Sequence, residues 1–380
     1  MNFDLTQEQE MIVKMARDVA TDVLAPRAAE VDEKGEYPAE NIKVLADLGL
    51  MGLTIAEEYG GTNLDTATYT MVVEELAKGC GSTASIMNIH NTTACLTLAR
   101  FGTEEQKQKY LASLSSGGVG SFAITEADSG SDAGSIKTTA VRDGDNYILN
   151  GTKCFISNAG RAEVYTIFAK TDKEAGTRGI SAFLVEAGTP GLTVGKQENK
   201  MGIRGSITCE LIIEDVVVPK ENLIGEEGKG FRVAMNVLDN ARLGCAAMSV
   251  GIAQAAFETA LEYAKERKQF GKPIIDFQGI GFMLSDMAMQ IEASRSLVYR
   301  AACADDAGQP SFGKLAAMAK CLASDMSVQV CLDAIQVLGG YGYMKEYPTE
   351  RFLRDAKITQ IYEGTNQIQR VVITNNLKRQ

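Results

Sequence analysis

The sequence predicts an α+β fold in which a β-rich middle segment separates two helical blocks. Apolar residues recur at helical spacing up to about residue 116, and long Ala- and Met-rich helical stretches return after Gly230. Between them, the segment 117–230 holds 18 of the 37 glycines and several short β-rich runs. We therefore expect three domains: an N-terminal α-helical domain at 1–116, a middle β-barrel-like domain at 117–230 and a C-terminal α-helical bundle at 231–380.

The first block begins with a helix-start signal. Thr6 and Gln9 have the spacing of a capping box, and the apolar residues that follow share one helical face. Breaks between the later helices are expected at Tyr37-Pro38, at 59–61 and at 79–81, where proline or glycine interrupts the pattern.

The middle segment reads as strands joined by turns. The residues 143–146, Asp-Gly-Asp-Asn, are typical of a hairpin turn. The β-rich runs are Tyr147–Leu149, Val164–Ala169, Ile180–Val185 and Leu211–Val218. No βαβ alternation and no G-x-G-x-x-G after a strand are present, which argues against a Rossmann sheet.

The last block is predicted to contain long buried helices. Residues 231–269 form a nearly continuous helical stretch rich in small side chains. Ile280, Leu284 and Met287 begin a second apolar stripe, and Leu315 begins a third.

Composition excludes several function classes. The net charge of −11 disfavours nucleic-acid binding, which normally needs a basic excess. His90 is the only histidine, so a site that needs two histidines is impossible, and a structural role suits it better. The eight cysteines show no C-x-x-C spacing, so zinc is improbable and buried thiols in a reducing compartment are expected.

The N-terminal stretch is acidic and its apolar residues are interleaved, unlike an export signal. No run approaches the ~20 apolar residues of a membrane span. We expect a cytoplasmic protein, or a mitochondrial matrix protein that has lost its transit peptide.

Three segments can carry chemistry, although each is weak alone. Glu363 precedes Gly364 at the end of a helical run, and a carboxylate in a dry pocket becomes a stronger base. A solvated residue at a helix end is the alternative. The segment 121–132 leads a short strand into a Gly/Ser-rich loop that can hold a phosphate or a polar ring edge, or is an ordinary turn. The segment 336–343 reads as a glycine-closed helix end.

Together these segments resemble the acyl-CoA dehydrogenase family over essentially the whole chain, most closely its short-chain, butyryl-CoA dehydrogenase-like branch. The matching landmarks, in order, are Glu57–Gly61, Phe101–Lys107, Ile124–Asp132, Asn150–Asn158, Arg267–Gly271, Gln336–Gly342 and Ile361–Thr365.

The resemblance implies FAD bound between the β domain and the C-terminal helices. Thr125 and Ser157 would be hydrogen-bond partners of the flavin's polar edge, and some of the cofactor contacts would come from a neighbouring subunit. The implied cofactor-binding residues are Phe122, Ile124, Thr125, Ser131, Phe155, Ile156, Ser157, Arg267, Phe270, Gln278, Gln336, Gly339, Gly340, Thr365 and Gln367.

The resemblance also implies a base and a thioester site. Glu363 would take the α-proton of an acyl-CoA while a β-hydride leaves to the flavin. Some members carry the base just before the arginine that matches Arg242, but Ala241 stands there. The implied substrate-binding residues are Ser131, Asp239, Arg242, Tyr362 and Gly364.

The implied substrate is a short acyl-CoA. No cation stands in 83–88, where members that act on dicarboxylic acyl groups carry an arginine. Branched or alicyclic acyl groups, an enoyl-CoA reductase working in the opposite direction, and a non-catalytic CoA-binding scaffold remain alternatives. The implied partners are electron-transferring flavoprotein and further copies of the chain in a homotetramer.

Overall fold

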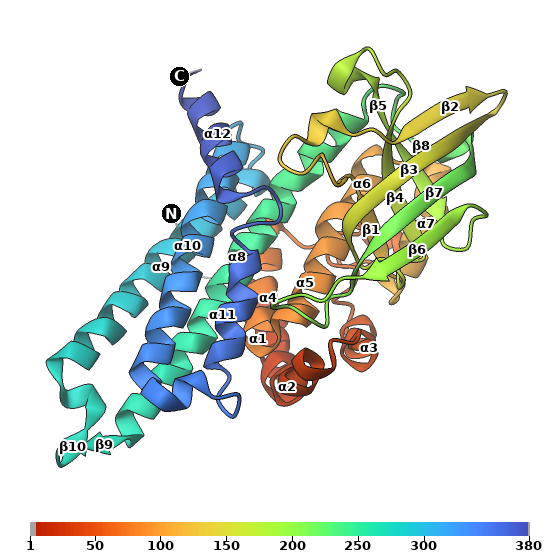
Figure 1. Ribbon diagram of the computed structural model, residues 1–380. Helices are drawn as coiled ribbons and strands as arrows, with labels where there is room; N and C mark the ends of the chain where they lie inside the picture. Colours follow the sequence, from red (N-terminus) through yellow and green to blue (C-terminus); the bar gives the residue numbers. More distant parts are fainter. Residues whose placement is uncertain (1–4, 379–380) are drawn as a thin grey trace.

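The computed structural model describes residues 5–378, so the outermost residues of the first and third predicted domains lie outside the described part. Figure 1 shows a long helical bundle with a twisted sheet at one side of it, and N-terminal helices that contact both. The family fold expected from the sequence, helical, then β, then helical, is confirmed.

The N-terminal part contains short helices. The capping box is present: the Thr6 hydroxyl accepts from the Gln9 backbone N–H at 3.2 Å, and the Gln9 side chain accepts from the Thr6 N–H at 3.0 Å. The helices are α1 (Gln7–Val19), α2 (Ala25–Lys34), α3 (Ala39–Asp47), α4 (Thr66–Gly79), α5 (Gly81–Ile89), α6 (Leu96–Phe101) and α7 (Glu104–Ser115).

Two π-helical turns interrupt this part, at η1 (Ala20–Leu24) and η3 (His90–Cys95). His90 in η3 is fully buried. Its Nδ1 accepts from the Gly120 N–H at 3.1 Å, which leaves Nε2 to donate to the Met51 carbonyl at 2.9 Å. Burial lowers the pKa of His90 to about 4, so the ring is neutral and ties η3 to the start of the sheet.

The middle part is one eight-stranded sheet with the order β6-β7-β3-β2-β4-β5-β8, and β1 pairs with β4. The predicted turn at 143–146 joins β2 to β3. The strands are β1 (Gly120–Ala123), β2 (Thr139–Asp143), β3 (Asn146–Ser157), β4 (Val164–Lys170), β5 (Ile180–Glu186), β6 (Leu192–Gln197), β7 (Thr208–Pro219) and β8 (Leu223–Ile224).

The expected barrel-like closure is not present in the pairing of these described strands. The order has two ends, because β6 pairs only with β7 and the two-residue β8 pairs only with β5. Both faces are nonetheless covered. Leu149 and Phe183 belong to one apolar core, whereas Phe168 and Leu184 pack with Val233, at the start of the long helix that follows the sheet.

A buried ion pair holds β1 and the loop after it to β3. Lys153 is fully buried, and its Nζ lies 2.8 Å from a Glu126 carboxylate oxygen and 3.2 Å from the Ile124 carbonyl. Burial alone would raise the pKa of Glu126, but Lys153 and hydrogen bonds from Thr138 keep it below its usual value. The loop after β1 is therefore fixed to the sheet by a paired charge.

The C-terminal part is a bundle of long helices that lie side by side in Figure 1. A two-stranded ribbon, β9 (Lys268–Gln269) with β10 (Lys272–Pro273), reverses the chain between the first and second of these helices. The helices are α8 (Gly230–Glu266), α9 (Gln278–Asp306), α10 (Phe312–Leu338), α11 (Thr349–Ile358) and α12 (Asn366–Leu377).

One described helical stretch, Phe312–Tyr343, is long and apolar enough to cross a membrane by length and composition, which corrects the expectation that no segment comes close. Of its apolar window, 56% is buried inside the protein, where α10 packs against α8 and α9. The expected domain boundaries fall between α7 and β1 and next to the start of α8. The division of the chain at these points stays a prediction.

Candidate active site

A cavity of about 340 Å³ lies between the sheet, helix α8 and the turn between α11 and α12. Eleven of the predicted site residues line it. They are Phe122, Ile124, Thr125, Ser131, Phe155, Ile156, Ser157, Arg242, Tyr362, Glu363 and Gly364. The structure thus brings together residues from three separate regions of the sequence.

Glu363 lies on a tight, strained turn. Its φ of +56° is a left-handed value that only few non-glycine residues adopt, and Gly364 follows with a φ of +86°. The Gln369 amide donates to the Glu363 carbonyl at 3.0 Å and to the Gly364 carbonyl at 2.9 Å. These bonds hold the turn so that its carboxylate faces the cavity.

The surroundings of Glu363 make it a better base than an ordinary glutamate. Burial raises its pKa to about 7, and the positive charges of Arg242 and Lys320 oppose this rise. A carboxylate with a pKa near neutral pH is suited to accepting a proton from a weak carbon acid.

Arg242 of α8 is 7% exposed and forms an ion pair with Asp239, one helical turn before it. Its Nε is buried and has no hydrogen-bond partner in the described part of the chain. A buried guanidinium N–H without a partner is costly, and a bound acceptor in the cavity would remove that cost. Asp239 itself does not line the cavity.

The sheet side of the cavity presents two hydroxyls and an aromatic ring. Within the described residues, the side-chain hydroxyls of Thr125 and Ser157 make no hydrogen bond. Their backbone carbonyls are engaged: that of Thr125 accepts from the Cys154 N–H at 2.9 Å, and that of Ser157 accepts from the Ser121 hydroxyl at 2.7 Å. Phe155 has a φ of +57° and a 62% exposed side chain. Free hydroxyls beside an exposed ring fit the polar edge and flat face of a flavin.

Part of the cavity wall was not predicted from the sequence. One signal was available on α8, because Phe231, Met235 and Leu238 precede Arg242 at spacings of four, three and four residues and so share its face. The other missed residues carried no such signal. They are Ile89, Thr93, Ala133, Gly134, Thr177 and Ile368.

A second hollow, of about 580 Å³, is lined by the predicted residues Arg267, Gly339 and Gly340, together with Tyr263 and Tyr341. It lies beside β9 and β10, at the end of the bundle away from the sheet (Figure 1). The structure therefore does not bring these predicted cofactor residues to the first cavity.

The remaining predicted residues line neither hollow. Phe270 is 94% exposed, and Gln278, Gln336 and Gln367 are also exposed. The Thr365 hydroxyl caps α12 by accepting from the Ile368 N–H at 3.2 Å.

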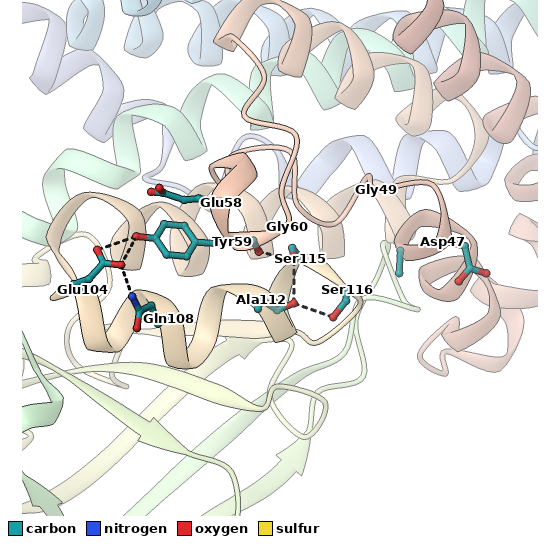
Figure 2. Close-up of a pocket in the computed structure, with 11 residues that line it drawn as sticks. Asp47, Gly49, Glu58, Tyr59, Gly60, Glu104, Gln108, Ala112, Ser115 and Ser116 are labelled. Carbon is teal, nitrogen blue, oxygen red and sulfur yellow. Dashed lines mark hydrogen bonds between the residues drawn. The ribbon is translucent and has the colours of Figure 1, made fainter.

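A third hollow of about 710 Å³, between α3 and α7, is lined by no predicted site residue. Figure 2 shows that three of its polar side chains bind one another: the Tyr59 hydroxyl donates to Glu104 at 2.9 Å, and the Gln108 amide donates to the same carboxylate at 3.0 Å.

Comparison with known proteins extends these observations along the whole chain. The chain matches the descriptions "Acyl-CoA dehydrogenase, N-terminal domain" over residues 6–118, "middle domain" over 121–216 and "C-terminal domain" over 228–378.

Full-length relatives and a solved structure agree with these matches. A short-chain specific acyl-CoA dehydrogenase of Clostridium acetobutylicum is 48% identical over all of both chains. An acryloyl-CoA reductase (NADH) of Anaerotignum propionicum is 50% identical over 100% of this chain and 96% of its own length. The structure of butyryl-CoA dehydrogenase from Megasphaera elsdenii superposes over all of both chains with a TM-score of 0.98 and 49% identity.

The fold and the full-length matches define an oxidoreductase that acts on CH–CH groups. The chain belongs to the acyl-CoA dehydrogenase family, whose members are FAD-dependent flavoproteins.

Proposed function

We propose that this enzyme dehydrogenates a short-chain acyl-CoA to the trans-2-enoyl-CoA, with Glu363 as the base that removes the α-proton. The observation that carries the proposal is the Glu363 carboxylate itself, which a strained turn holds in the cavity and whose pKa burial raises to about 7. A carboxylate held in the cavity in this way also argues against a non-catalytic scaffold.

The substrate's α-C–H bond is a weak acid, so the thioester oxygen needs a donor as negative charge develops on it. No hydrogen bond in the described part of the chain engages the Glu363 backbone N–H. This N–H is therefore free to donate to the thioester oxygen beside the carboxylate that accepts the proton. One residue would then supply both the base and a donor to the developing oxyanion.

The cavity fits the flavin that the family uses. Thr125 and Ser157 offer free hydroxyls to a polar ring edge, and Phe155 offers an exposed ring face. When bound there, FAD supplies the acceptor for the β-hydride. The chain's own contribution is to orient the acyl group between Glu363 and these residues and to keep water away from the base.

The proposed preference for a short, uncharged acyl chain has an electrostatic basis. Among the described residues, the two cations that act on Glu363 are Arg242, which is paired with Asp239, and Lys320. The segment 83–88 offers no cation and is fully or nearly fully buried. A distal carboxylate that reached this segment would be buried without a partner, which costs several kcal/mol at worst, on the order of magnitude seen for unpaired buried charges.

A second candidate is the reverse reaction, reduction of a 2-enoyl-CoA. The similarity to an acryloyl-CoA reductase, at 50% identity, favours keeping it. The same groups would serve, because Glu363 in its protonated form would return the α-proton. The direction then depends on the electron donor or acceptor.

We further propose that electron-transferring flavoprotein exchanges electrons with the enzyme and that the chain forms a homotetramer. The second hollow supports the oligomer, because Arg267, Gly339 and Gly340 match cofactor contacts yet lie away from the first cavity in the same chain. A neighbouring copy would place them on its cofactor.

The test is to purify the protein, record its flavin spectrum and follow anaerobic bleaching on addition of acyl-CoAs. We expect a yellow protein whose FAD is reduced by butyryl-CoA and hexanoyl-CoA. The matched series contains isovaleryl-, cyclohexanecarbonyl- and glutaryl-CoA. A colourless folded protein that cannot be reconstituted, or bleaching by none of these thioesters, would refute the proposal, and a ring substrate that clearly wins would refute the short-chain preference.

A further inference from the structure

We propose that Lys320 is a positioning residue for the reaction: from α10 it holds the turn that carries Glu363 and places a positive charge beside it that favours the ionised form of this base. This inference rests on the proposed role of Glu363.

Lys320, on α10, contacts the turn that carries Glu363. Its Nζ donates to the Gly364 carbonyl at 2.8 Å and to the Asn366 side-chain oxygen at 3.0 Å. Asn366 in turn donates to Asp325 at 2.7 Å, also on α10. The catalytic turn is thereby fixed to a core helix rather than only to its own flanking residues.

The burial of Lys320 is not explained by these hydrogen bonds alone. The residue is 0% exposed, and no carboxylate oxygen of the described residues lies within ion-pair distance of its Nζ. A buried ammonium without a nearby negative charge is strongly disfavoured, and burial lowers the pKa of Lys320 accordingly. Glu363, the residue before Gly364 on the same turn, is among the groups whose negative charge opposes this lowering of the Lys320 pKa.

The other titratable groups that face Glu363 are effectively neutral or already paired. Burial raises the pKa of Cys245 on α8 to about 12, and it raises the pKa values of Tyr69 on α4 and Tyr362 on the turn well above the usual range. Arg242 on α8 is positively charged but forms an ion pair with Asp239. Lys320 is therefore the cation near the base that has no carboxylate partner of its own in the described residues.

A neutral donor at the same carbonyl provides a matched control. The Gln369 amide also donates to Gly364, at 2.9 Å, and it is fully buried like Lys320. If Lys320 acts only as a hydrogen-bond donor, removal of either side chain should have the same kind of effect. If its charge matters, only loss of Lys320 should change the titration of the base.

The experiment measures the pH dependence of flavin reduction by butyryl-CoA in the holoenzymes of wild type, K320M, K320Q, K320R and Q369M. The kcat/KM profile reports the free enzyme's base. We expect the acid limb of K320M and K320Q to move to higher pH by about one unit, on the scale of the effect of a nearby opposite charge. The acid limb of the K320R profile should lie at the same pH as that of wild type. Q369M should lower the rate without changing the pH of the acid limb.

A second readout separates proton abstraction from hydride transfer: exchange of the α-proton of a thioester into D2O, followed by mass spectrometry, should show the same shift. An unchanged limb in both neutral variants, or an equal shift in Q369M, would overturn the charge role. K320Q keeps a neutral hydrogen-bond donor, so it serves if K320M does not fold. Wild type that reduces its flavin with none of the thioesters would instead refute the proposed function, and the role of Lys320 with it.

Discussion

Replacement of Glu363 by glutamine should slow catalysis and stabilise the protein at the same time. The amide has nearly the same shape but cannot accept the α-proton, so kcat should fall by about 10²–10⁴-fold while substrate affinity is nearly unchanged. Because it is also uncharged, it removes the cost of holding an ionised carboxylate in a poorly solvated site. Both effects follow from the same burial.

The stability gain can be calculated from the pKa of Glu363, which burial raises from 4.5 to about 7. A group whose folded-state pKa is raised contributes stability that is fully present below the unfolded value and is lost as pH rises through the folded value. Wild type should therefore lose about 3 kcal/mol between pH 4.5 and pH values above 7, as an upper figure, and E363Q should not.

The assay is denaturant unfolding of both holoenzymes at pH 5 and pH 8.5, at one fixed protein concentration because an oligomer's stability depends on it. The advantage of E363Q should be small at pH 5 and should grow at pH 8.5. Stopped-flow bleaching with butyryl-CoA gives the catalytic loss. Bleaching near the wild-type rate, or a stability difference independent of pH, would refute the assignment of Glu363 as a buried base.

Further predictions concern pH, shape, substrate and assembly. The kcat/KM of wild type should fall as pH drops below about 7, because Glu363 must be ionised, and a profile flat to pH 5 would contradict its pKa of about 7. Gly364→Ala should lower both stability and kcat, because the backbone there has a φ of +86° and the added Cβ would lie 2.7 Å from the Gln369 amide nitrogen; circular dichroism melting and bleaching rates test this. Discrimination in kcat/KM should be graded between butyryl- and hexanoyl-CoA but steep against glutaryl-CoA, so equal values for butyryl- and glutaryl-CoA would remove the argument from the missing cation. Light scattering should give a tetramer with one FAD per chain, and Arg267→Ala should weaken FAD retention; a monomer that keeps its flavin would contradict the shared site.

The parts of the site that the sequence could predict are those set by local backbone chemistry. The turn at Glu363 and Gly364 could be predicted because a glycine there permits the left-handed backbone that the structure shows, whereas the role expected of Glu363 came from the resemblance to the family. Strand β3 and its turn followed from the Asp-Gly-Asp-Asn spacing. Such turns depend on residues that are adjacent in the chain, so they can be predicted from the order of the amino acids.

What could not be predicted depends on contacts between distant segments. Lys320 lies in a long apolar helix with no motif around it, and only the packing of α10 against the 363–366 turn reveals its partners. Thr93 faces the cavity because η3 orients it there, and no pattern in the sequence marked that π turn. The open sheet also escaped prediction, because strand composition does not say which strands pair at the ends.

The π turn η3 lies in a helical stretch that contributes both to the cavity wall and to the apolar core. Ile89 and Thr93 line the cavity, whereas Cys95 and Leu98 belong to the apolar core beneath the sheet. Each residue of an α-helix turns the following side chains by about 100°, and a π turn holds one additional residue without changing the length of the flanking loops. One residue inserted into or removed from this stretch should therefore change the wall of the cavity, while the helices on either side keep their alignment.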